Sequence, residues 1–295
     1  MAKRILILGA SGLIGHKLFE RLSDRFGTVY GTLHRTRDCF SETGLFETDR
    51  IIDSVDVHDF DKLRGVMHSV RPDVVLNCVG ITKRRPEVKI PLEAITVNAL
   101  LPHRLADWGQ KNNARVIHFS TDCVFDGALG DYDEQSHTTA TDEYGQTKAL
   151  GEIRYDHSLT IRSSFIGREL DVFSELLEWF LQQNGKTIKG FTNALYTGVS
   201  TIVMSKVVGD IIESHPDING LHQLSSPEAI SKFDLLCLAR DAFKMDVEIV
   251  PESDFVCKAS LNGELLRNKM NLKVPSWQEM LAELASETMY DKIKR

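Results

Sequence analysis

The chain has 295 residues and a formal net charge of −7, from 35 basic and 42 acidic side chains. This acidic balance disfavours a sequence-independent nucleic-acid binder, which needs a basic face. No apolar run approaches the roughly 20 residues that cross a bilayer. The five cysteines are scattered and never form Cys-x-x-Cys, which is typical of reduced thiols in a cytoplasmic protein. We therefore expect a cytoplasmic globular protein with no nucleic-acid or membrane partner.

Short apolar strands alternate with amphipathic helices through the first half of the chain. Such alternation is typical of a parallel sheet with helices on both faces. The expected strands are 3–8, 28–33, 50–53, 73–77, 115–119 and 159–162, and the expected helices are 13–23, 60–69, 92–111 and 144–155.

The regular alternation of short strands and helices ends at about residue 167. A helix at 172–183 precedes a stretch rich in glycine and asparagine at 185–198, which is expected to interrupt the regular structure. A helix at 201–213 and a strand at 221–224 follow, and then segments 231–243, 247–250 and 276–287. We predict an α/β protein with a Rossmann-type doubly wound parallel sheet and a smaller C-terminal α/β lobe for the substrate. Residues 1–166 form the dinucleotide-binding domain, with its sheet completed by 197–225, and residues 167–196 and 226–295 form the lobe.

The first strand runs directly into the sequence Gly9-Ala-Ser-Gly-Leu-Ile-Gly15, which opens a helix. Glycines permit a tight turn in which backbone N–H groups approach a pyrophosphate, and the helix N-terminus adds partial positive charge. The alternative is an ordinary glycine-rich turn. The expected cofactor contacts here are Gly9, Ser11, Gly12, Leu13, Ile14 and Gly15.

The choice of cofactor is predicted at the end of the second strand. NAD-dependent enzymes usually place a carboxylate there for the ribose hydroxyls, whereas this chain has His34 and Arg35. A guanidinium is permanently charged and can bind a 2′-phosphate bidentately. We therefore predict NADPH, with NADH as the alternative; a solvated basic loop is the competing interpretation.

Tyr144 and Lys148 lie four residues apart, on one face of a predicted helix. Reduction of a ketone requires a proton for the developing alkoxide, which a tyrosine can donate, and a nearby lysine stabilises the resulting phenolate. Thr121 follows Ser120 at the end of a strand, at the rim where open α/β sheets bind ligands. We predict Thr121, Tyr144 and Lys148 as catalytic residues. Ser120, Tyr144 and Lys148 are also expected to contact the cofactor.

The spacing Gly-x-x-Gly-x-x-Gly resembles the extended short-chain dehydrogenase/reductase superfamily. The string Ser-Thr-Asp-Cys-Val-Phe-Asp-Gly at 120–127 resembles the dTDP-4-dehydrorhamnose reductase family more specifically, as do segments 161–164, 231–236 and 260–262 and Trp277. The resemblance implies further cofactor contacts at Asp56, Val57, Cys78, Val79, Gly80 and Asn98.

Three segments depart from the family pattern, all on the expected sugar-nucleotide side. Cys123 replaces a tyrosine, residues 192–198 replace a typical Asp-Gln-x-Gly-x-Pro-Thr segment, and a basic loop follows the fourth strand. The basic loop could clamp a diphosphate or be a solvated loop. The expected substrate contacts are Lys83, Arg84, Arg85, Thr121, Asp122, Cys123, Arg168 and Asn193, and no metal site is expected.

The predicted function is NADPH-dependent reduction of a nucleotide-linked 4-keto-6-deoxy sugar. A 4,6-dehydratase of the same superfamily is disfavoured, because Cys123 stands where those enzymes carry a glutamate base. The open alternatives are a nucleotide-sugar epimerase and a non-catalytic subunit that resembles the regulatory subunit of methionine adenosyltransferase. A homodimer is the assembly we consider, since dimers are the commonest oligomers.

Overall fold

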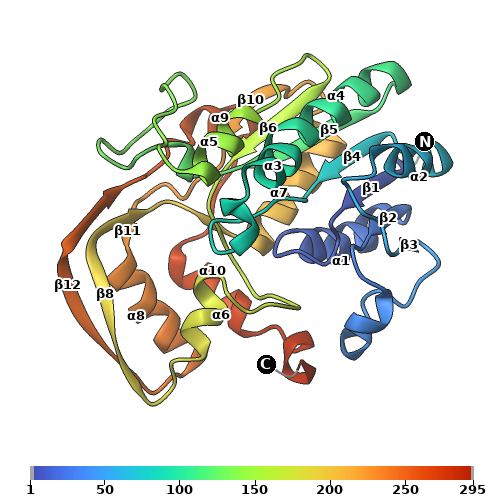
Figure 1. The fold of residues 1–295 in the computed structure, drawn as a ribbon. Coiled ribbons are helices and arrows are strands. Elements are labelled where there is room, and N and C mark those ends of the chain that lie inside the picture. The colour runs from blue at the N-terminus through green and yellow to red at the C-terminus, as the bar shows by residue number, and fades with distance from the viewer. Residues whose placement is uncertain (1–2, 294–295) are drawn as a thin grey trace.

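A parallel sheet forms the centre of the molecule in the computed structural model, which describes residues 3–293 (Figure 1). Within these residues the sheet has seven strands in the order β10-β6-β5-β4-β1-β2-β3, and every pair is parallel. The chain winds outward in both directions from the β1–β4 pair, which confirms the predicted doubly wound fold. The strands are β1 (Ile5–Leu8), β2 (Val29–Thr32), β3 (Ile51–Ile52), β4 (Val74–Asn77), β5 (Arg115–Ser120), β6 (Ser158–Arg162) and β10 (Gly220–Gln223).

Alternate residues of the strands pack against helices on opposite faces of this sheet. Ile5 and Ile7 of β1 join the cluster that contains apolar residues of α1 (Gly15–Phe26) and α7 (Thr201–Ser214). Leu6 and Leu8 join the cluster on the other face, with α2 (Phe60–Val70) and α4 (Leu101–Asn112). Successive side chains of a strand point to opposite faces of the sheet. One short apolar run therefore packs against the helical layers on both faces.

A second sheet lies beside the central one and contains the chain's longest strands. Within residues 3–293 it has three strands in the order β11-β8-β12, and β8 and β12 curve side by side along one edge of the molecule (Figure 1). Its strands are β8 (Lys186–Tyr196), β11 (Ile230–Ser231) and β12 (Val247–Lys258), and the helix α8 (Lys232–Phe243) packs against β8. The remaining elements are α5 (Glu143–Leu150), β7 (Phe165–Ile166), α6 (Leu176–Leu181), β9 (Val199–Ser200), α9 (Glu264–Met270) and α10 (Trp277–Ala285).

Two predictions for this second half were wrong. The stretch 185–198 was expected to interrupt regular structure, yet most of it is β8, because parallel pairing with β12 satisfies its backbone despite weak strand propensity. The helix expected at 172–183 starts only at Leu176. Val172 and Phe173 have φ angles of 68° and 49°, a left-handed conformation that no α-helix contains.

The long helix expected at 92–111 is divided into three parts. It consists of α3 (Pro91–Ala94), a π-helical turn (Ile95–Leu100) and α4. The buried Asn98 in the π turn accepts from the Ile81 N–H at 2.9 Å and donates to the Ile81 carbonyl at 3.0 Å. π turns of this kind often lie at functional sites, and this one holds the loop after β4.

Buried histidines are expected to make the fold acid-sensitive. His16 and His118 are fully buried; burial lowers the pKa of His16 to about 3 and that of His118 well below 6.5. Below about pH 6.5 the unfolded chain therefore binds protons that the folded chain does not, so folding stability falls as the pH falls from there toward 3. We expect the free energy of unfolding to drop by about 1.4 kcal/mol per pH unit for each histidine.

Urea denaturation across pH 4 to 7 measures this slope. Glu169 acts in the opposite sense, because burial raises its pKa to about 7 and the folded chain holds its proton above the normal glutamate range. His16→Gln should flatten the acid slope, whereas the same change at the exposed His137 should leave it unaltered. Equal slopes in the wild type and both variants would contradict the prediction.

Within residues 3–293, no helix combines the length and the apolar character of a membrane span.

Candidate functional site

A cavity of about 730 Å³ opens at the carboxyl ends of the central strands, where β1, β4 and β5 meet the second sheet. Open α/β sheets bind ligands at this point, because the strand order reverses there. Its walls are drawn from the glycine turn, from the loops after β4 and β5, from α5 and from the second half of the chain. The predicted residues that line it are Ser11, Gly12, Leu13, Ile14, Cys78, Val79, Gly80, Lys83, Arg84, Arg85, Ser120, Thr121, Asp122, Cys123, Tyr144 and Lys148.

The glycine turn forms one end of this cavity. The Gly9 N–H donates to the Thr32 hydroxyl at 3.2 Å, which ties the turn to β2. A Cβ on Gly15 would lie 2.0 Å from the Gly9 carbonyl oxygen, and Gly9 has a φ of +75°. Neither position tolerates a side chain, and the first turn of α1 leaves N–H groups without helical partners. The turn therefore fits the pyrophosphate of a dinucleotide.

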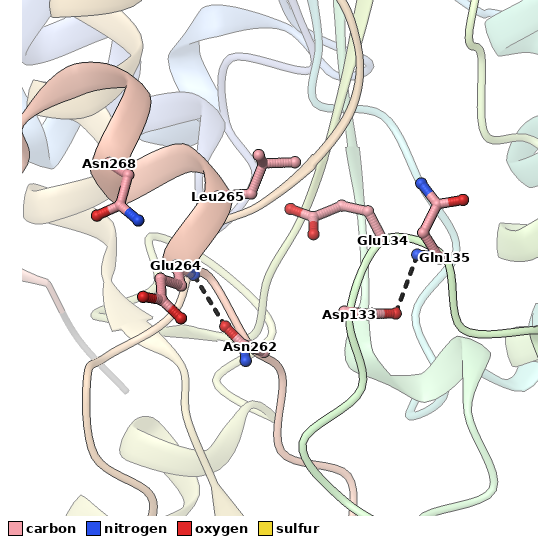
Figure 2. A pocket seen from close by; sticks show the side chains of 7 residues that line it. All are labelled: Asp133, Glu134, Gln135, Asn262, Glu264, Leu265 and Asn268. Carbon is pink, nitrogen blue, oxygen red and sulfur yellow. Dashed lines mark hydrogen bonds between the residues drawn. The ribbon is translucent and has the colours of Figure 1, made fainter.

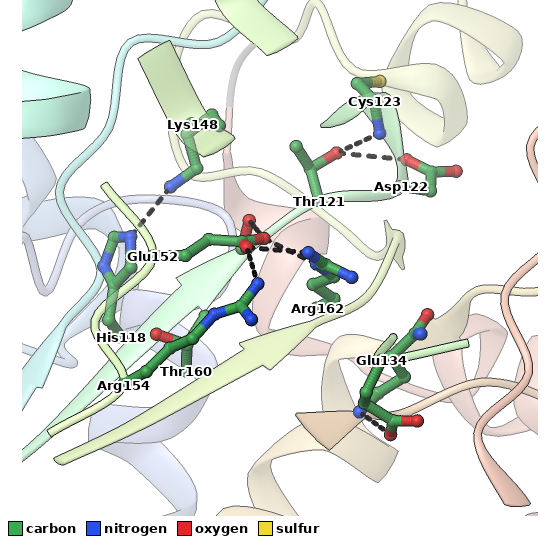
Figure 3. Close-up of polar contacts among 12 residues, drawn as sticks. His118, Thr121, Asp122, Cys123, Glu134, Lys148, Glu152, Arg154, Thr160 and Arg162 are labelled. Atoms are coloured by element: carbon green, nitrogen blue, oxygen red, sulfur yellow. Dashed lines mark hydrogen bonds and ion pairs between the residues drawn. The ribbon is translucent and has the colours of Figure 1, made fainter. Parts of the chain in front are cut away.

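The Tyr144 phenol lies in the cavity next to Thr121. The Thr121 hydroxyl donates to the Asp122 carboxylate at 3.0 Å and accepts from the Cys123 N–H at 3.1 Å (Figure 3). Burial raises the pKa of Tyr144 above its usual 10. At neutral pH the group is therefore a phenol, the form from which a proton can be donated.

The Lys148 ammonium is directed toward the end of β5. Its Nζ donates to the Phe119 carbonyl at 2.6 Å and lies 3.3 Å from His118 Nε2 (Figure 3). Burial lowers the pKa of Lys148 to about 8, although Glu152 acts in the opposite direction. We expected Lys148 to stabilise the Tyr144 phenolate, but burial of both side chains dominates the two pKa values.

A buried ion pair supports the strand that carries Thr121. Glu152 accepts from Arg162 Nε at 2.6 Å and from Nη2 at 2.8 Å (Figure 3). It also accepts from the Ser120 hydroxyl at 2.9 Å. Arg162 is fully buried, and its guanidinium lies 5.1 Å from the centre of the Phe125 ring. The pair thus links β6, β5 and the end of α5 behind the catalytic candidates.

The basic loop after β4 lines the cavity, and part of its positive charge is neutralised by ion pairs with carboxylates. Lys83 Nζ lies 2.6 Å from the Asp142 carboxylate. Arg84 donates to the Ser174 carbonyl at 2.6 Å and lies 3.7 Å from Glu175. The loop is therefore tied to segment 171–175 across the cavity.

Several predicted cofactor residues lie outside the cavity lining. Arg35 forms an ion pair with Asp171, which does line the cavity, and its guanidinium lies over the Phe40 ring. Asp56 accepts from the ring of His58 at 2.8 Å. The others outside the lining are Gly9, Gly15, His34, Val57 and Asn98.

Two predicted substrate residues are engaged elsewhere. Arg168 is buried and its Nε donates to Glu178 at 2.6 Å, with the guanidinium over the Tyr290 ring. Asn193 lies on β8 and donates to the Ser253 carbonyl at 2.9 Å. Neither lines the cavity, so neither is part of the proposed site.

The second half of the chain contributes cavity residues that sequence reasoning missed. Lys232 lies at the start of α8 with its Nζ 4.0 Å from the centre of the Tyr196 ring. Phe191 of β8 and Phe255 of β12 pack at 4.9 Å near them, and all four line the cavity. Lys232 lies within the family-like segment 231–236, which was the available signal. Nothing in the local pattern marked the aromatic pair.

A smaller hollow of about 370 Å³ lies elsewhere (Figure 2). Its lining residues make local turn contacts, such as the Glu264 N–H to Asn262 at 3.0 Å, and Glu134 accepts from the Gln223 N–H at 2.9 Å. Among residues 3–293 no group of three histidine, cysteine or acidic side chains is placed to hold a metal ion. The hollow is lined by Asp133, Glu134, Gln135, Asn262, Glu264, Leu265 and Asn268.

The fold and the glycine turn define a Rossmann-like α/β protein with a cavity at the switch point of its sheet. The family model described as the RmlD substrate binding domain matches residues 3–290. The chain therefore belongs to this family, which confirms the resemblance to dTDP-4-dehydrorhamnose reductases.

Individual relatives align with most of this chain, and their names describe different proteins. "Probable low-salt glycan biosynthesis reductase Agl14" of Haloferax volcanii is 26% identical, over 94% of this chain and 96% of its own length. Methionine adenosyltransferase 2 subunit beta of Mus musculus is 25% identical, over 83% of this chain and 73% of its own. The crystal structure of dTDP-4-dehydrorhamnose reductase from Bacillus anthracis in complex with NADP has a TM-score of 0.78 at 20% identity, covering 96% of this chain and 99% of the other.

Proposed function

We propose that the protein is an NADPH-dependent reductase of a nucleotide-linked 4-keto-6-deoxy sugar, with Tyr144 as the proton donor. The observation that carries the proposal is that Thr121, Tyr144 and Lys148 line one cavity that also contains the glycine turn. Family membership and the similarity to reductases support the same activity.

The residues of this chain have separate tasks in that reaction. NADPH, held by the turn at 11–14 and by Cys78, Val79 and Gly80, supplies the hydride when bound. The Thr121 hydroxyl orients the substrate carbonyl, and Tyr144 donates its Oη proton as charge develops on the carbonyl oxygen. Its raised pKa favours this direction, because the phenol is the form present at neutral pH.

The sugar nucleotide is proposed to lie against the second half of the chain. Arg85 of the loop after β4 and Lys232 of α8 both line the cavity, and cations are suited to a diphosphate. Residues 1–166 and 197–225 are thus proposed as the cofactor-binding unit, and 167–196 and 226–295 as the substrate lobe.

Arg35 is proposed to select NADPH through the 2′-phosphate, which must displace Asp171. Arg35→Ala should weaken NADPH binding by about 10- to 100-fold, because a charge-assisted contact is lost. Asp171→Ala should instead tighten NADPH binding, since the competing carboxylate is removed. Calorimetric titration of both cofactors measures these effects, with NADH as the control ligand. Equal NADPH affinity in the wild type and Arg35→Ala would refute the assignment.

Absorbance decay of NADPH tests the activity, across dTDP-, UDP- and GDP-linked 4-keto sugars generated in place by dehydratases. We expect stoichiometric oxidation of NADPH with at least one of them. A 4-epimerase would instead recycle its cofactor without net oxidation. The similarity to methionine adenosyltransferase subunit beta keeps a non-catalytic subunit as the second candidate. Tight NADPH binding without oxidation by any sugar would favour that candidate.

A further inference from the structure

We infer that the C-terminal segment of the chain positions the dinucleotide-binding turn, through a hydrogen bond from the Tyr290 hydroxyl to His16 and a second one from the His16 ring to the Gly12 carbonyl. Tyr290 lies in a 3₁₀ turn (Met289–Lys292), and His16 lies in the first turn of α1, directly after Gly15. Neither side chain lines the cavity, so both are positioning residues. The inference rests on the proposed function only in assigning the pyrophosphate of the cofactor to the glycine turn.

The partners of the His16 ring determine which ring nitrogen carries the proton. Nδ1 lies 2.8 Å from the Gly12 carbonyl oxygen, which can only accept, so the proton is on Nδ1. His16 is fully buried, and burial together with the charges of Lys17 and Arg168 lowers its pKa to about 3, although the bond to Gly12 acts in the opposite direction. The ring is therefore neutral at neutral pH, and its Nε2 accepts from the Tyr290 hydroxyl at 2.6 Å.

The carbonyl that His16 contacts belongs to the peptide between Gly12 and Leu13, two residues that line the cavity. The C=O and N–H of a trans peptide point in opposite directions, so a bond that holds the Gly12 carbonyl also sets the direction of the Leu13 N–H. Among residues 3–293 this N–H has no hydrogen-bond partner. It is therefore available to an anionic group such as a pyrophosphate.

The same carbonyl accepts a second, weaker restraint from the backbone. The His16 N–H donates to it at 3.1 Å, as the first hydrogen bond of the helix. Without the ring, only this terminal helical bond would hold the peptide, and bonds at the ends of helices open readily. The His16 ring thus adds a side-chain bond at the place where the turn is held least by the backbone.

The C-terminal segment is anchored by contacts that do not involve the Tyr290 hydroxyl. The buried Lys17 of α1 lies with its Nζ 2.5 Å from the Glu287 carboxylate. The Arg168 guanidinium lies 4.5 Å from the centre of the Tyr290 ring, and its Nε donates to Glu178 of α6 at 2.6 Å. Removal of the hydroxyl alone should therefore leave the ring and the segment in place, so the hydrogen bond can be tested by itself.

Tyr290→Phe removes the hydroxyl and keeps the ring. We expect NADPH to bind about three- to tenfold more weakly, the usual effect of one hydrogen bond. The analogue 2′-phospho-ADP-ribose has the pyrophosphate but no nicotinamide, and it should lose the same factor. Adenosine 2′-phosphate has no pyrophosphate and should bind as it does to the wild type. Calorimetric titration measures the first two ligands, and ligand-observed NMR follows the weak monophosphate.

This comparison of ligands separates positioning of the turn from a general loss of structure. A variant whose fold is merely loosened would lose affinity for all three ligands alike, and that result would overturn the inference. Unchanged NADPH affinity in Tyr290→Phe would overturn it as well.

His16→Leu tests whether the two hydrogen bonds act as one chain. Leucine has a similar volume and neither a donor nor an acceptor, so the Gly12 carbonyl loses its side-chain partner. We expect NADPH affinity to fall about tenfold. Tyr290→Phe should have no further effect on this background, because the hydroxyl acts only through the ring. Additive losses in the double variant would overturn the chain of contacts.

Nitrogen NMR of labelled histidine observes the tautomer in the intact protein and needs no ligand. We expect the His16 ring to have a protonated Nδ1 and an unprotonated Nε2, the signals being assigned by their loss in His16→Leu or, if that variant does not fold, in His16→Gln. A protonated Nε2 in the wild type would overturn the inference.

Tyr132→Phe is the matched control. Tyr132 is also a buried tyrosine, its hydroxyl donates to Asp126 at 3.0 Å, and it lies outside the cavity lining. It should bind NADPH with wild-type affinity, and a loss equal to that of Tyr290→Phe would overturn the inference. A protein that binds NADPH in a Tyr290-dependent way but reduces no sugar would refute the proposed function and support the inference, so the two failures are distinguishable.

Discussion

Tyr144→Phe is expected to bind NADPH with wild-type affinity and to turn over about 10²- to 10⁴-fold more slowly, the usual contribution of a general acid. The substitution removes one hydroxyl, which lines the cavity and carries the transferable proton of the proposed mechanism. The ring remains to fill the buried wall of the cavity, so no large loss of stability accompanies the change. Single-turnover measurements with preloaded NADPH separate the chemical step from binding.

The control for this substitution is Tyr155→Phe. Tyr155 is partly exposed and bonds His103 at 2.9 Å, outside the cavity, so its loss should leave turnover within twofold, about 0.4 kcal/mol in barrier height. Near-wild-type turnover in Tyr144→Phe would remove the proton donor from the proposed mechanism and leave the fold and cofactor site intact.

Glu152→Ala is expected to lower the free energy of unfolding by about 3–5 kcal/mol, because it leaves a buried guanidinium uncompensated. Arg162 is fully buried, donates two hydrogen bonds to Glu152 and has an Nη1 with no hydrogen-bond partner among the described residues. The Ser120 hydroxyl loses its acceptor in the same variant. Urea denaturation at neutral pH measures the loss.

Two comparisons isolate the buried charge as the cause. Asp107→Ala breaks an exposed ion pair with Lys111 at 2.7 Å and should cost less than about 1 kcal/mol. The double variant Glu152→Leu with Arg162→Met removes both charges and should recover much of the loss. A Glu152→Ala protein as stable as Asp107→Ala would show that Arg162 finds another partner.

Local sequence signals were sufficient to predict the strands of the central sheet and to select the catalytic candidates. The short apolar runs predicted β1, β4, β5 and β6 to within one or two residues, because strands buried on both faces have continuous apolar sequences. The turn beginning at Gly9 was recognisable because its local backbone requires glycine: Gly9 has a positive φ, and a Cβ on Gly15 would meet the Gly9 carbonyl oxygen. Thr121, Tyr144 and Lys148 line the cavity that this turn enters, although their catalytic roles stay predictions.

Long-range pairing explains what local signals missed. β8 is stabilised by β12, about 60 residues later in the chain, and no local pattern encodes that partner. The positive charge of Arg168 suggested a contact with the substrate. In the structure its guanidinium instead forms an ion pair with the buried Glu178 of α6. The contact between His118 on β5 and Lys148 on α5 joins two separate elements, so no spacing in the sequence could have indicated it.

The position of β10 constrains how the polypeptide can be shortened or synthesised. β10 hydrogen-bonds to β6 at the border of the sheet, and the apolar residues of α7 cover those of α1. A fragment that stopped at residue 166 would leave the outer backbone groups of β6 unpaired and Leu18 and Leu22 uncovered, an arrangement that favours aggregation. A nascent chain therefore cannot complete the central sheet until residue 223 has left the ribosome. The central sheet and the second sheet should consequently unfold together, and an expressed fragment that ends at residue 166 should be insoluble.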